Sequence, residues 1–172
     1  MPFLPVAGVR VLDLTTSIAG PYCTEILAAL GAEVIKVERP DTGDDARAWG
    51  PPFWDGESAM FLAVNAGKRS LAVSLADERG REVVRRLTET ADVFLQGLRP
   101  GRAEALGLGA DPLRARNPRL VYCSIGAYGR TGPLSEEPGY DALIQAAGGL
   151  ISITGEPGTA GARVGSSLID MG

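Results

Sequence analysis

The stretch Val9–Glu38, VRVLDLTTSIAGPYCTEILAALGAEVIKVE, decides the fold of this chain. Its ends, Val9–Leu14 and Glu33–Glu38, are short apolar runs rich in β-branched residues and predict strands. The segment Tyr22–Leu30 between them predicts a helix, and Pro21 suits its first turn. Three residues form the expected apolar stripe of that helix: Ile26, Leu27 and Leu30. Two strands joined by so short a crossover helix are expected to be parallel.

The same alternation continues beyond a Gly- and Pro-rich loop at residues 39–59. Further strands are expected at Lys68–Leu75, Asp92–Gln96 and Leu120–Ser124. Helical segments are expected at Glu78–Glu89, with Val83, Val84 and Leu87 facing inward, and at Arg102–Leu106, Asp111–Arg116 and Asp141–Ala147. The tail from Gly148 is rich in Gly, Ser and Thr, and no linker between two domains is evident. The sequence therefore predicts an α/β fold with one open, mainly parallel, Rossmann-like sheet and helices on both faces.

Composition narrows the classes of function. The chain has 172 residues, 45% of them hydrophobic, which is enough for one domain of ordinary size with a sizeable core. Its net charge of −4 and lack of a Lys/Arg-rich run argue against a nucleic-acid partner. No apolar run reaches the ~18 residues needed to cross a bilayer, and the first residues do not resemble a secretory signal. A cytoplasmic protein without a membrane partner is expected.

Histidine is absent from the chain. This excludes, within these residues, a Ser-His or Cys-His nucleophile pair and any His-based metal site. The two cysteines, Cys23 and Cys123, form no C-x-x-C pair and lie on an apolar helix and strand, so we expect buried core thiols and no metal centre. Any acid, base or nucleophile here must be Asp, Glu, Lys, Tyr, Cys, Ser or Thr.

The loop Thr15–Pro21 joins a strand end to a helix start, where α/β proteins often bind phosphate. Glu38, at the end of the next strand, is placed like the ribose-binding acid of a dinucleotide-binding domain. However, the loop has one glycine where G-x-G-x-x-G needs three, and Pro21 removes an amide. We therefore disfavour NAD or FAD, and a simple tight turn stays open.

Several charged residues have two readings from position alone. Arg39 could pair with a phosphate or stack on an adenine, or be an ordinary surface arginine, as is usual for Lys68 and Arg69 also. Asp141 precedes a predicted helix and could be its N-cap. Asp170 is, on these grounds, one aspartate among many.

Taken together, these segments resemble the family III CoA-transferases (carnitine dehydratase/bile-acid-inducible protein F type, which includes formyl-CoA transferase). The resemblance covers residues 8–172 and rests on the order and spacing of many short motifs. They are Val11-Leu12-Asp13-Leu14, Ala19-Gly20-Pro21, Leu30–Glu38, Asn65 with Lys68-Arg69-Ser70, Ala91-Asp92-Val93 with Arg99-Pro100-Gly101, Asn117–Val121, Gly129–Pro133, Gly139-Tyr140-Asp141, Gln145-Ala146 and Gly148-Gly149.

The resemblance implies that coenzyme A is moved from an acyl-CoA to a carboxylic acid through a catalytic aspartate. By motif position this residue is Asp170, with Asp141 and Tyr140 as possible supporting groups. A carboxylate is required because its acyl derivative must itself become a CoA thioester. Coenzyme A and acyl-CoA are substrates, and no permanently bound cofactor or metal is implied.

The resemblance also implies a set of CoA-binding positions along the strand ends: Ser17, Ile18, Ala19, Arg39, Val73, Gly97, Leu98, Arg102 and Leu106. At three places, Ala76, Gly97 and Ala105, some members of the family carry larger polar side chains. Arg99 or Arg102 could replace the missing contacts to the pyrophosphate.

Members of this family are longer than this chain. The resemblance implies that residues 1–172 form the N-terminal part of the CoA-binding large domain, without the small domain and the C-terminal return segment. It also implies an interlocked homodimer at full length, and a fragment that is inactive alone or a mere binder of CoA esters.

A rival within the same superfamily is the 2-methylacyl-CoA racemase, which shares the fold and moves a proton next to the thioester carbonyl. Racemases have a histidine at the position of Tyr140, paired with the residue that matches Asp170. Tyrosine, with an ordinary pKa near 10, is a poor base at neutral pH. Transfer is therefore favoured over racemisation.

Overall fold

The computed structural model describes residues 3–172, and these fall into two compact units that meet between Ile125 and Gly126: residues 3–125 and residues 126–172. The sequence showed no linker at this boundary, because Ile125-Gly126 is no richer in Gly or Pro than several turns inside the first unit. Each unit is described by itself. No helix among residues 3–172 has the length and apolar character needed to span a bilayer.

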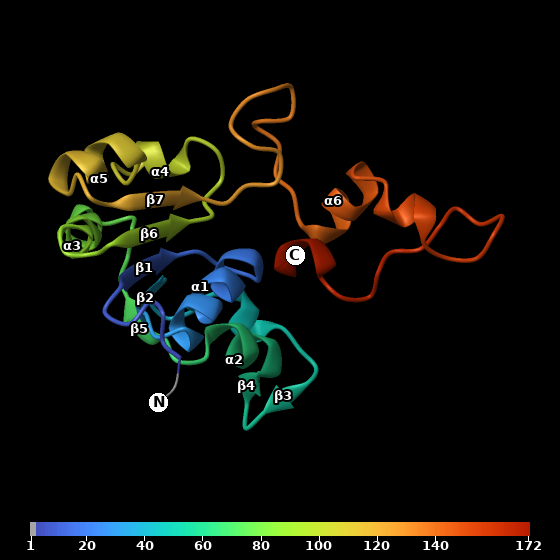
Figure 1. The fold of residues 1–172 in the computed structure, drawn as a ribbon, viewed down its shortest axis with the longest axis horizontal. Coiled ribbons are helices and arrows are strands. Elements are labelled where there is room, and N and C mark those ends of the chain that lie inside the picture. Colours follow the sequence, from blue (N-terminus) through green and yellow to red (C-terminus); the bar gives the residue numbers. More distant parts are fainter. Residues whose placement is uncertain (1–2) are drawn as a thin grey trace. The chain divides into compact units, whose positions relative to one another are not determined.

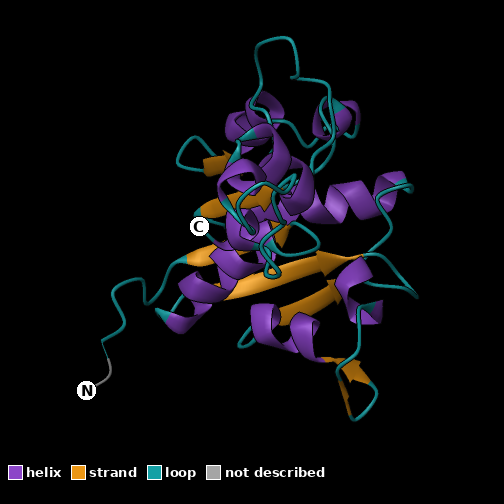
Figure 2. Ribbon diagram, turned by 90° about the vertical axis from the view of Figure 1, so that its right-hand side faces the viewer, coloured by secondary structure: helices purple, strands orange, loops and turns teal. Residues whose placement is uncertain are grey.

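The first unit is built on a five-stranded sheet with the order β5-β2-β1-β6-β7. Its strands are β1 (Arg10–Leu14), β2 (Glu33–Glu38), β5 (Arg69–Ala72), β6 (Val93–Gln96) and β7 (Val121–Ser124). Every pair of neighbours is parallel, so all carboxyl ends lie at one edge. The predicted parallel α/β sheet is confirmed, and Figure 2 shows its strands in orange with helices on either side.

Helices cover both faces of this sheet (Figure 1). On one face, α1 (Ala19–Ala29) packs Leu27 and Ala28 against a core that includes Val11 and Val34. On the other, α3 (Glu78–Thr88), α4 (Arg102–Ala105) and α5 (Ala110–Arg116) enclose the larger core around Leu12 and Phe94. Because side chains alternate along a strand, β1 supplies both cores from adjacent residues.

Three predicted side-chain positions are wrong. Cys23 is exposed, as is Ile26, whose side chain we expected in the apolar stripe of α1. On α3, Val84 is fully buried and Leu87 packs against the core, but Val83 is exposed. The reason is geometric: consecutive helical residues point about 100° apart, so Val83 and Val84 cannot both face the same core.

The segment 39–67 holds more structure than the predicted loop. It contains a 3₁₀ helix, η1 (Asp45–Ala48), a short hairpin of β3 (Phe53–Trp54) and β4 (Glu57–Ser58), and α2 (Ala59–Asn65). Ser58 caps α2, since its Oγ accepts a hydrogen bond from the Phe61 amide at 3.2 Å. The sequence did not predict α2, because the helix is too short to show a clear apolar periodicity and Gly and Pro residues surround it.

The second unit contains α6 (Asp141–Ala147), as predicted, and two short elements in the tail that were not predicted. These are the 3₁₀ helix η2 (Leu150–Ile153) and α7 (Leu168–Met171). Tyr140, rather than Asp141, stands at the N-cap of α6.

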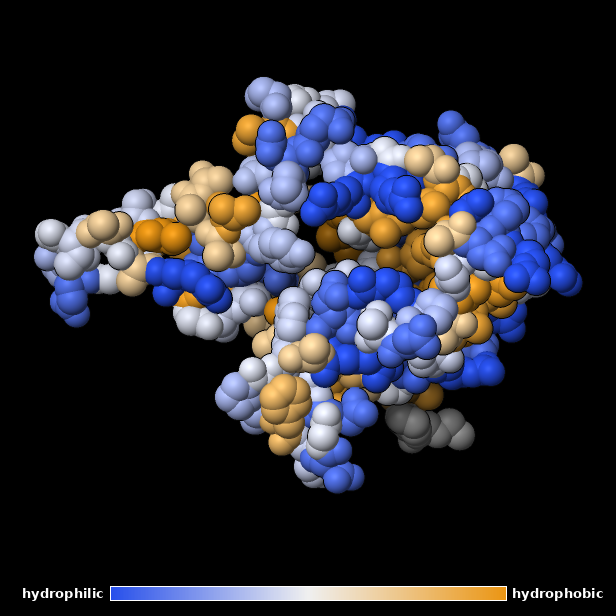
Figure 3. Space-filling view, turned by 180° about the vertical axis from the view of Figure 1, so that it is seen from behind, coloured by the Kyte–Doolittle hydropathy of each residue, from blue (hydrophilic) through white to orange (hydrophobic). Residues whose placement is uncertain are grey.

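The outer surface of α3 and α5 is mainly hydrophilic, at the right of Figure 3. Arg116 of α5 pairs with Glu82 and Glu89, and Arg85 pairs with Glu82 and Glu78. The Arg85 side chain is only 14% exposed, but its partners and Arg116 are 36–66% exposed, so each pair adds little stability but keeps this face solvated.

A partly buried ion pair ties the segment after β2 to the sheet. Arg47 of η1 donates from Nε and a terminal nitrogen to the two carboxylate oxygens of Glu38, each at 2.9 Å. Ser70 Oγ and the Asp44 amide also donate to Glu38, at 2.6 and 3.0 Å. Burial alone would raise the pKa of Glu38, but these donors outweigh it and lower the pKa to about 2.

Replacing Gly80 tests the packing of α3 against the end of β5. An alanine Cβ there would lie 1.9 Å from the carbonyl oxygen of Ser74, so the backbone must move. Gly80→Ala should lower the free energy of unfolding by about 1–3 kcal/mol, although alanine is the better helix former. Urea unfolding measures this. Gly126→Ala, whose Cβ would meet no atom within 4 Å, is the control and should change little; equal stability of both variants would contradict the packing.

Replacing Glu38 tests the ion pair with Arg47. Because the folded-state pKa lies near 2 and the ordinary value near 4.5, the pair stabilises the fold above pH 4.5 and loses this effect as the pH falls toward 2. Glu38→Gln should therefore cost about 2–3 kcal/mol at pH 7 and progressively less below pH 4.5. Urea unfolding at pH 7, 5 and 3.5 measures the difference. A difference that stays constant over this range would contradict the assignment.

Candidate functional site

The first candidate site lies at the carboxyl edge of the sheet, where the direction of strand addition reverses. From β1 the chain adds β2 and β5 on one side, and β6 and β7 on the other. Loops that leave β1 and β6 therefore diverge to opposite faces, and such a switch point is where open α/β sheets bind ligands. The two loops are adjacent, since a Cβ on Gly97 would lie 3.8 Å from Thr15 Cγ2.

The loop after β1 runs from Thr15 to Ile18, and α1 begins at Ala19. Ser17 adopts a left-handed backbone conformation with φ +72°, which L-residues rarely adopt. No side chain caps the start of α1, so its first amides face the loop. Gly20 is required here, because a Cβ would lie 2.3 Å from Thr15 Cβ.

Buried charges lie directly under this loop. Asp13, at 0% exposure, accepts hydrogen bonds from the Thr15 amide at 2.9 Å and from Thr24 Oγ1 of α1 at 2.6 Å. Its Oδ2 is also 3.2 Å from Lys68 Nζ. Lys68 donates in addition to the Pro21 carbonyl at 2.7 Å and to Asn65 Oδ1 at 2.8 Å. Burial lowers the pKa of Lys68 to about 8.

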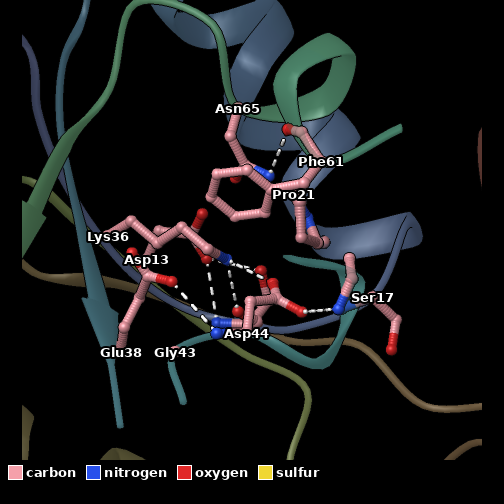
Figure 4. Close-up of polar contacts among 12 residues, drawn as sticks. Asp13, Ser17, Pro21, Lys36, Glu38, Gly43, Asp44, Phe61 and Asn65 are labelled. Carbon is pink, nitrogen blue, oxygen red and sulfur yellow. Dashed lines mark hydrogen bonds and ion pairs between the residues drawn. The ribbon is translucent and has the colours of Figure 1, made fainter. Parts of the chain in front are cut away.

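A second buried pair, Lys36 and Asp44, completes this cluster (Figure 4). Lys36 Nζ lies 2.8 Å from Asp44 Oδ2, and the side chains are 2% and 0% exposed. Lys36 also donates to the Thr15 carbonyl at 2.8 Å, while Asp44 Oδ1 accepts from the Ser17 amide at 3.0 Å. The Thr15 carbonyl and the Ser17 amide, on either side of Thr16, are therefore both bound by buried side chains.

The exposed-lysine reading of Lys68 is thus wrong, and the Arg69 side chain is exposed as expected, at 73%. Glu38 accepts four hydrogen bonds, which uses the acceptor capacity of both carboxylate oxygens. No acceptor remains for the hydroxyls of a ribose. This geometry argues further against a dinucleotide-binding domain, because Glu38 was the residue placed like its ribose-binding acid.

Most predicted CoA-binding positions follow strand ends of this edge. Arg39 follows β2, Val73 follows β5, and Gly97 and Leu98 follow β6. Arg39 pairs with Asp45. Because its side chain is nevertheless 57% exposed, the guanidinium is accessible to a ligand. Leu98 is anchored by its amide, which donates to Gln96 Oε1 at 2.8 Å.

The remaining predicted positions differ in exposure. Arg102 is exposed on α4, and Ala19 is partly exposed. Ile18 and Leu106 are buried, at 6% and 7% exposure, and Leu106 belongs to the large core. Side-chain contact with a ligand is therefore open to Arg102 but very restricted for Ile18 and Leu106.

The second candidate site lies within the unit Gly126–Gly172 and brings two predicted residues together. Asp141 is buried at 4% exposure, and its Oδ1 accepts the amides of Ile169 at 2.7 Å and Asp170 at 3.4 Å. Asp141 therefore caps α7 from a distant position in the chain, instead of capping α6 as the sequence suggested. Gln145 donates to Asp141 Oδ2 and accepts from the Val164 amide at 2.9 Å, which fixes the segment before α7.

Burial raises the pKa of Asp170, and the nearby charge of Asp141 raises it further. A carboxylate in this setting is a stronger base and nucleophile than a fully solvated one. Tyr140 is 67% exposed, so its ring is available at the surface of this unit.

Sequence reasoning missed the roles of Lys36 and Asp44. A signal for Lys36 was present: it lies in a strand that the parallel topology buries on both faces, and a charge there requires a partner. Asp44 gave no such signal, because an aspartate after Gly43 is an ordinary loop residue.

The sequence matches a known protein family. The family model "CoA-transferase family III" matches residues 6–172. A mouse succinyl-CoA:glutarate CoA-transferase is 48% identical over 97% of this chain and 38% of its own length. An Agrobacterium fabrum succinate–glutarate CoA-transferase is 44% identical over 97% of this chain and 43% of its own length.

Solved structures agree. A CAIB/BAIF family protein from Brucella suis, known from a crystal structure, is 44% identical, with a TM-score of 0.94 over 99% of this chain and 46% of that chain. The chain thus spans less than half the length of these relatives. Because the family model matches nearly the whole sequence, the chain belongs to CoA-transferase family III.

Proposed function

We propose that the protein transfers coenzyme A from an acyl-CoA to a carboxylic acid through a covalent intermediate on Asp170. The observation that carries this proposal is the position of Asp170, partly buried beside Asp141, with its pKa raised. Membership of CoA-transferase family III supports the reaction class.

The chemistry needs a carboxylate that can be activated twice. Asp170 attacks the thioester carbonyl of the donor, which forms a mixed anhydride and releases CoA thiolate. The thiolate then attacks the aspartyl carbonyl, giving an aspartyl-CoA thioester and the free donor acid. The acceptor carboxylate attacks this thioester and again releases CoA thiolate. Attack of the thiolate on the acceptor's acyl group yields the new acyl-CoA and restores Asp170.

The carboxyl edge of the first unit would hold the coenzyme A substrate in this proposal. Ser17, Ile18 and Ala19 in the first loop, with Gly97 and Leu98 beside it, offer backbone groups at the switch point. Arg39 is suited to the adenine or a phosphate. The relatives named for succinate and glutarate make dicarboxylic acids the first substrates to test.

The remaining parts of the proposal rest on the family. We propose that residues 1–172 belong to the CoA-binding large domain and that the complete protein is a cytoplasmic, interlocked homodimer without a permanently bound cofactor. The tests below accordingly use the complete open reading frame that contains this sequence.

Asp170→Asn tests the nucleophile. The amide keeps the shape but cannot attack a thioester, so CoA binding should persist while kcat falls by about a thousandfold or more. Mass spectrometry of wild-type protein quenched after mixing with succinyl-CoA should find CoA linked to Asp170. Asp141→Asn is the matched comparison, and if it abolished transfer while Asp170→Asn retained it, the assignment would be wrong.

Arg39→Ala tests the CoA edge. Loss of a stacked or charge-paired guanidinium is worth on the order of 1–2 kcal/mol, so the Kd for CoA in calorimetry should rise about 5- to 30-fold. Arg69→Ala removes an exposed arginine that pairs with Glu33 at the opposite edge of the sheet, and serves as the control. Equal Kd values for Arg39→Ala and the wild type would place Arg39 among ordinary surface residues.

A further inference from the structure

The loop proposed to bind CoA depends on two side chains that cannot touch the ligand themselves. Lys36 and Asp44 lie beneath it, with side chains 2% and 0% exposed. We propose that this pair, the Lys36–Asp44 clamp, is a positioning device that fixes the Thr15–Ser17 backbone in its ligand-binding conformation. The inference rests on the proposed function, because it assigns a role toward the same CoA site.

The contacts of the clamp bracket the residue at the tip of the turn. Lys36 Nζ donates to the carbonyl oxygen of Thr15 at 2.8 Å, and Asp44 Oδ1 accepts from the amide of Ser17 at 3.0 Å. The peptide groups before and after Thr16 are therefore both oriented from inside the fold. Neither of these contacts uses the side chain of Ser17, whose amide faces Asp44 in Figure 4.

The backbone of the loop requires such a constraint. Ser17 has φ +72°, in the left-handed region, and a non-glycine residue stays there only when its surroundings determine it. The cap of α1 supplies no constraint of its own, since no side chain accepts a hydrogen bond at its N-terminus. The directed side-chain contact to Ser17 comes from Asp44.

The charges of the clamp compensate each other and hold its geometry. Asp44 Oδ1 is shared between the amides of Ser17 and Ala46, each at 3.0 Å. Asp44 Oδ2 accepts no directed hydrogen bond among the described residues and faces Lys36 Nζ at 2.8 Å. Since an unpaired buried carboxylate is strongly disfavoured, Lys36 fixes where Asp44 can lie, and Asp44 fixes Ser17.

The test neutralises both members together in the double variant Lys36→Met/Asp44→Asn, because removing one charge alone would leave the other buried and unpaired. We expect the Kd for CoA and the KM for the acyl-CoA donor to rise about tenfold or more through misplacement of the loop. At saturating donor, kcat should stay within about twofold of wild type, because Asp170 is untouched. Calorimetry with CoA and steady-state kinetics measure the two effects.

The matched control is Arg10→Met/Glu33→Gln. This pair also joins β1 to β2, with Arg10 Nε 3.3 Å from Glu33 Oε2, but at the amino edge and about 40% exposed. We expect wild-type Kd and KM from it. Far-ultraviolet circular dichroism and the unfolding midpoint show whether each double variant is folded.

The outcomes are distinct. If folded Lys36→Met/Asp44→Asn binds CoA with the wild-type Kd, or if the Arg10 control loses as much affinity, the clamp does not position the loop. If the double variant does not fold, hydrogen exchange of the wild-type protein decides: the Ser17 amide should be protected, and exchange at the rate of an unstructured peptide overturns the inference. If the wild type itself fails to bind CoA, it is the proposed function that fails.

Discussion

The structure depends on a set of charges buried at the carboxyl ends of β1 and β2. Asp13, Lys36, Asp44 and Lys68 have side chains no more than 2% exposed. Removing an ion from water costs several kcal/mol, so each charge persists only because an opposite charge and directed donors surround it. Those partners come from α1, α2 and the segment around η1, and a shift in any of these elements would leave a buried charge without compensation.

This arrangement explains why a polar cluster stands where apolar packing would be simpler. Apolar side chains of similar volume can stabilise a fold equally well, but they do not orient carbonyl and amide groups. Here the bonds from Asp13, Lys36 and Asp44 reach backbone atoms of Thr15 and Ser17. Because three elements hold the cluster in place, their packing also fixes the backbone conformation of the loop after β1. This loop lies at the switch point between β1 and β6.

The sequence predicted the regular elements well, because their signals are local. Hydrophobic runs and turn residues located every strand of the large sheet and its main helices to within a few residues. The misplaced side chains and the unpredicted α2 have a common cause. Tertiary packing decides whether a short segment becomes a helix and which side chains of a helix are buried. Contacts such as Ser17 with Asp44, or Asp141 with Ile169, join residues 27 and 28 positions apart through polar groups, which leave no periodic trace.

Hydrogen bonds from backbone amides to a buried carboxylate also explain the environment of Asp170. An aspartate near a helix N-terminus is ordinarily stabilised as the anion by free amides, and this lowers its pKa and its basicity. In α7 the amides of Ile169 and Asp170 are instead directed at the carboxylate of Asp141. Asp141 thus removes donors that would stabilise the Asp170 anion and adds a like charge beside it, while burial removes part of its solvent. For the carboxylate that we propose as the attacking group, loss of ground-state stabilisation favours reaction, and this loss arises from the same Asp141 contacts that order α7.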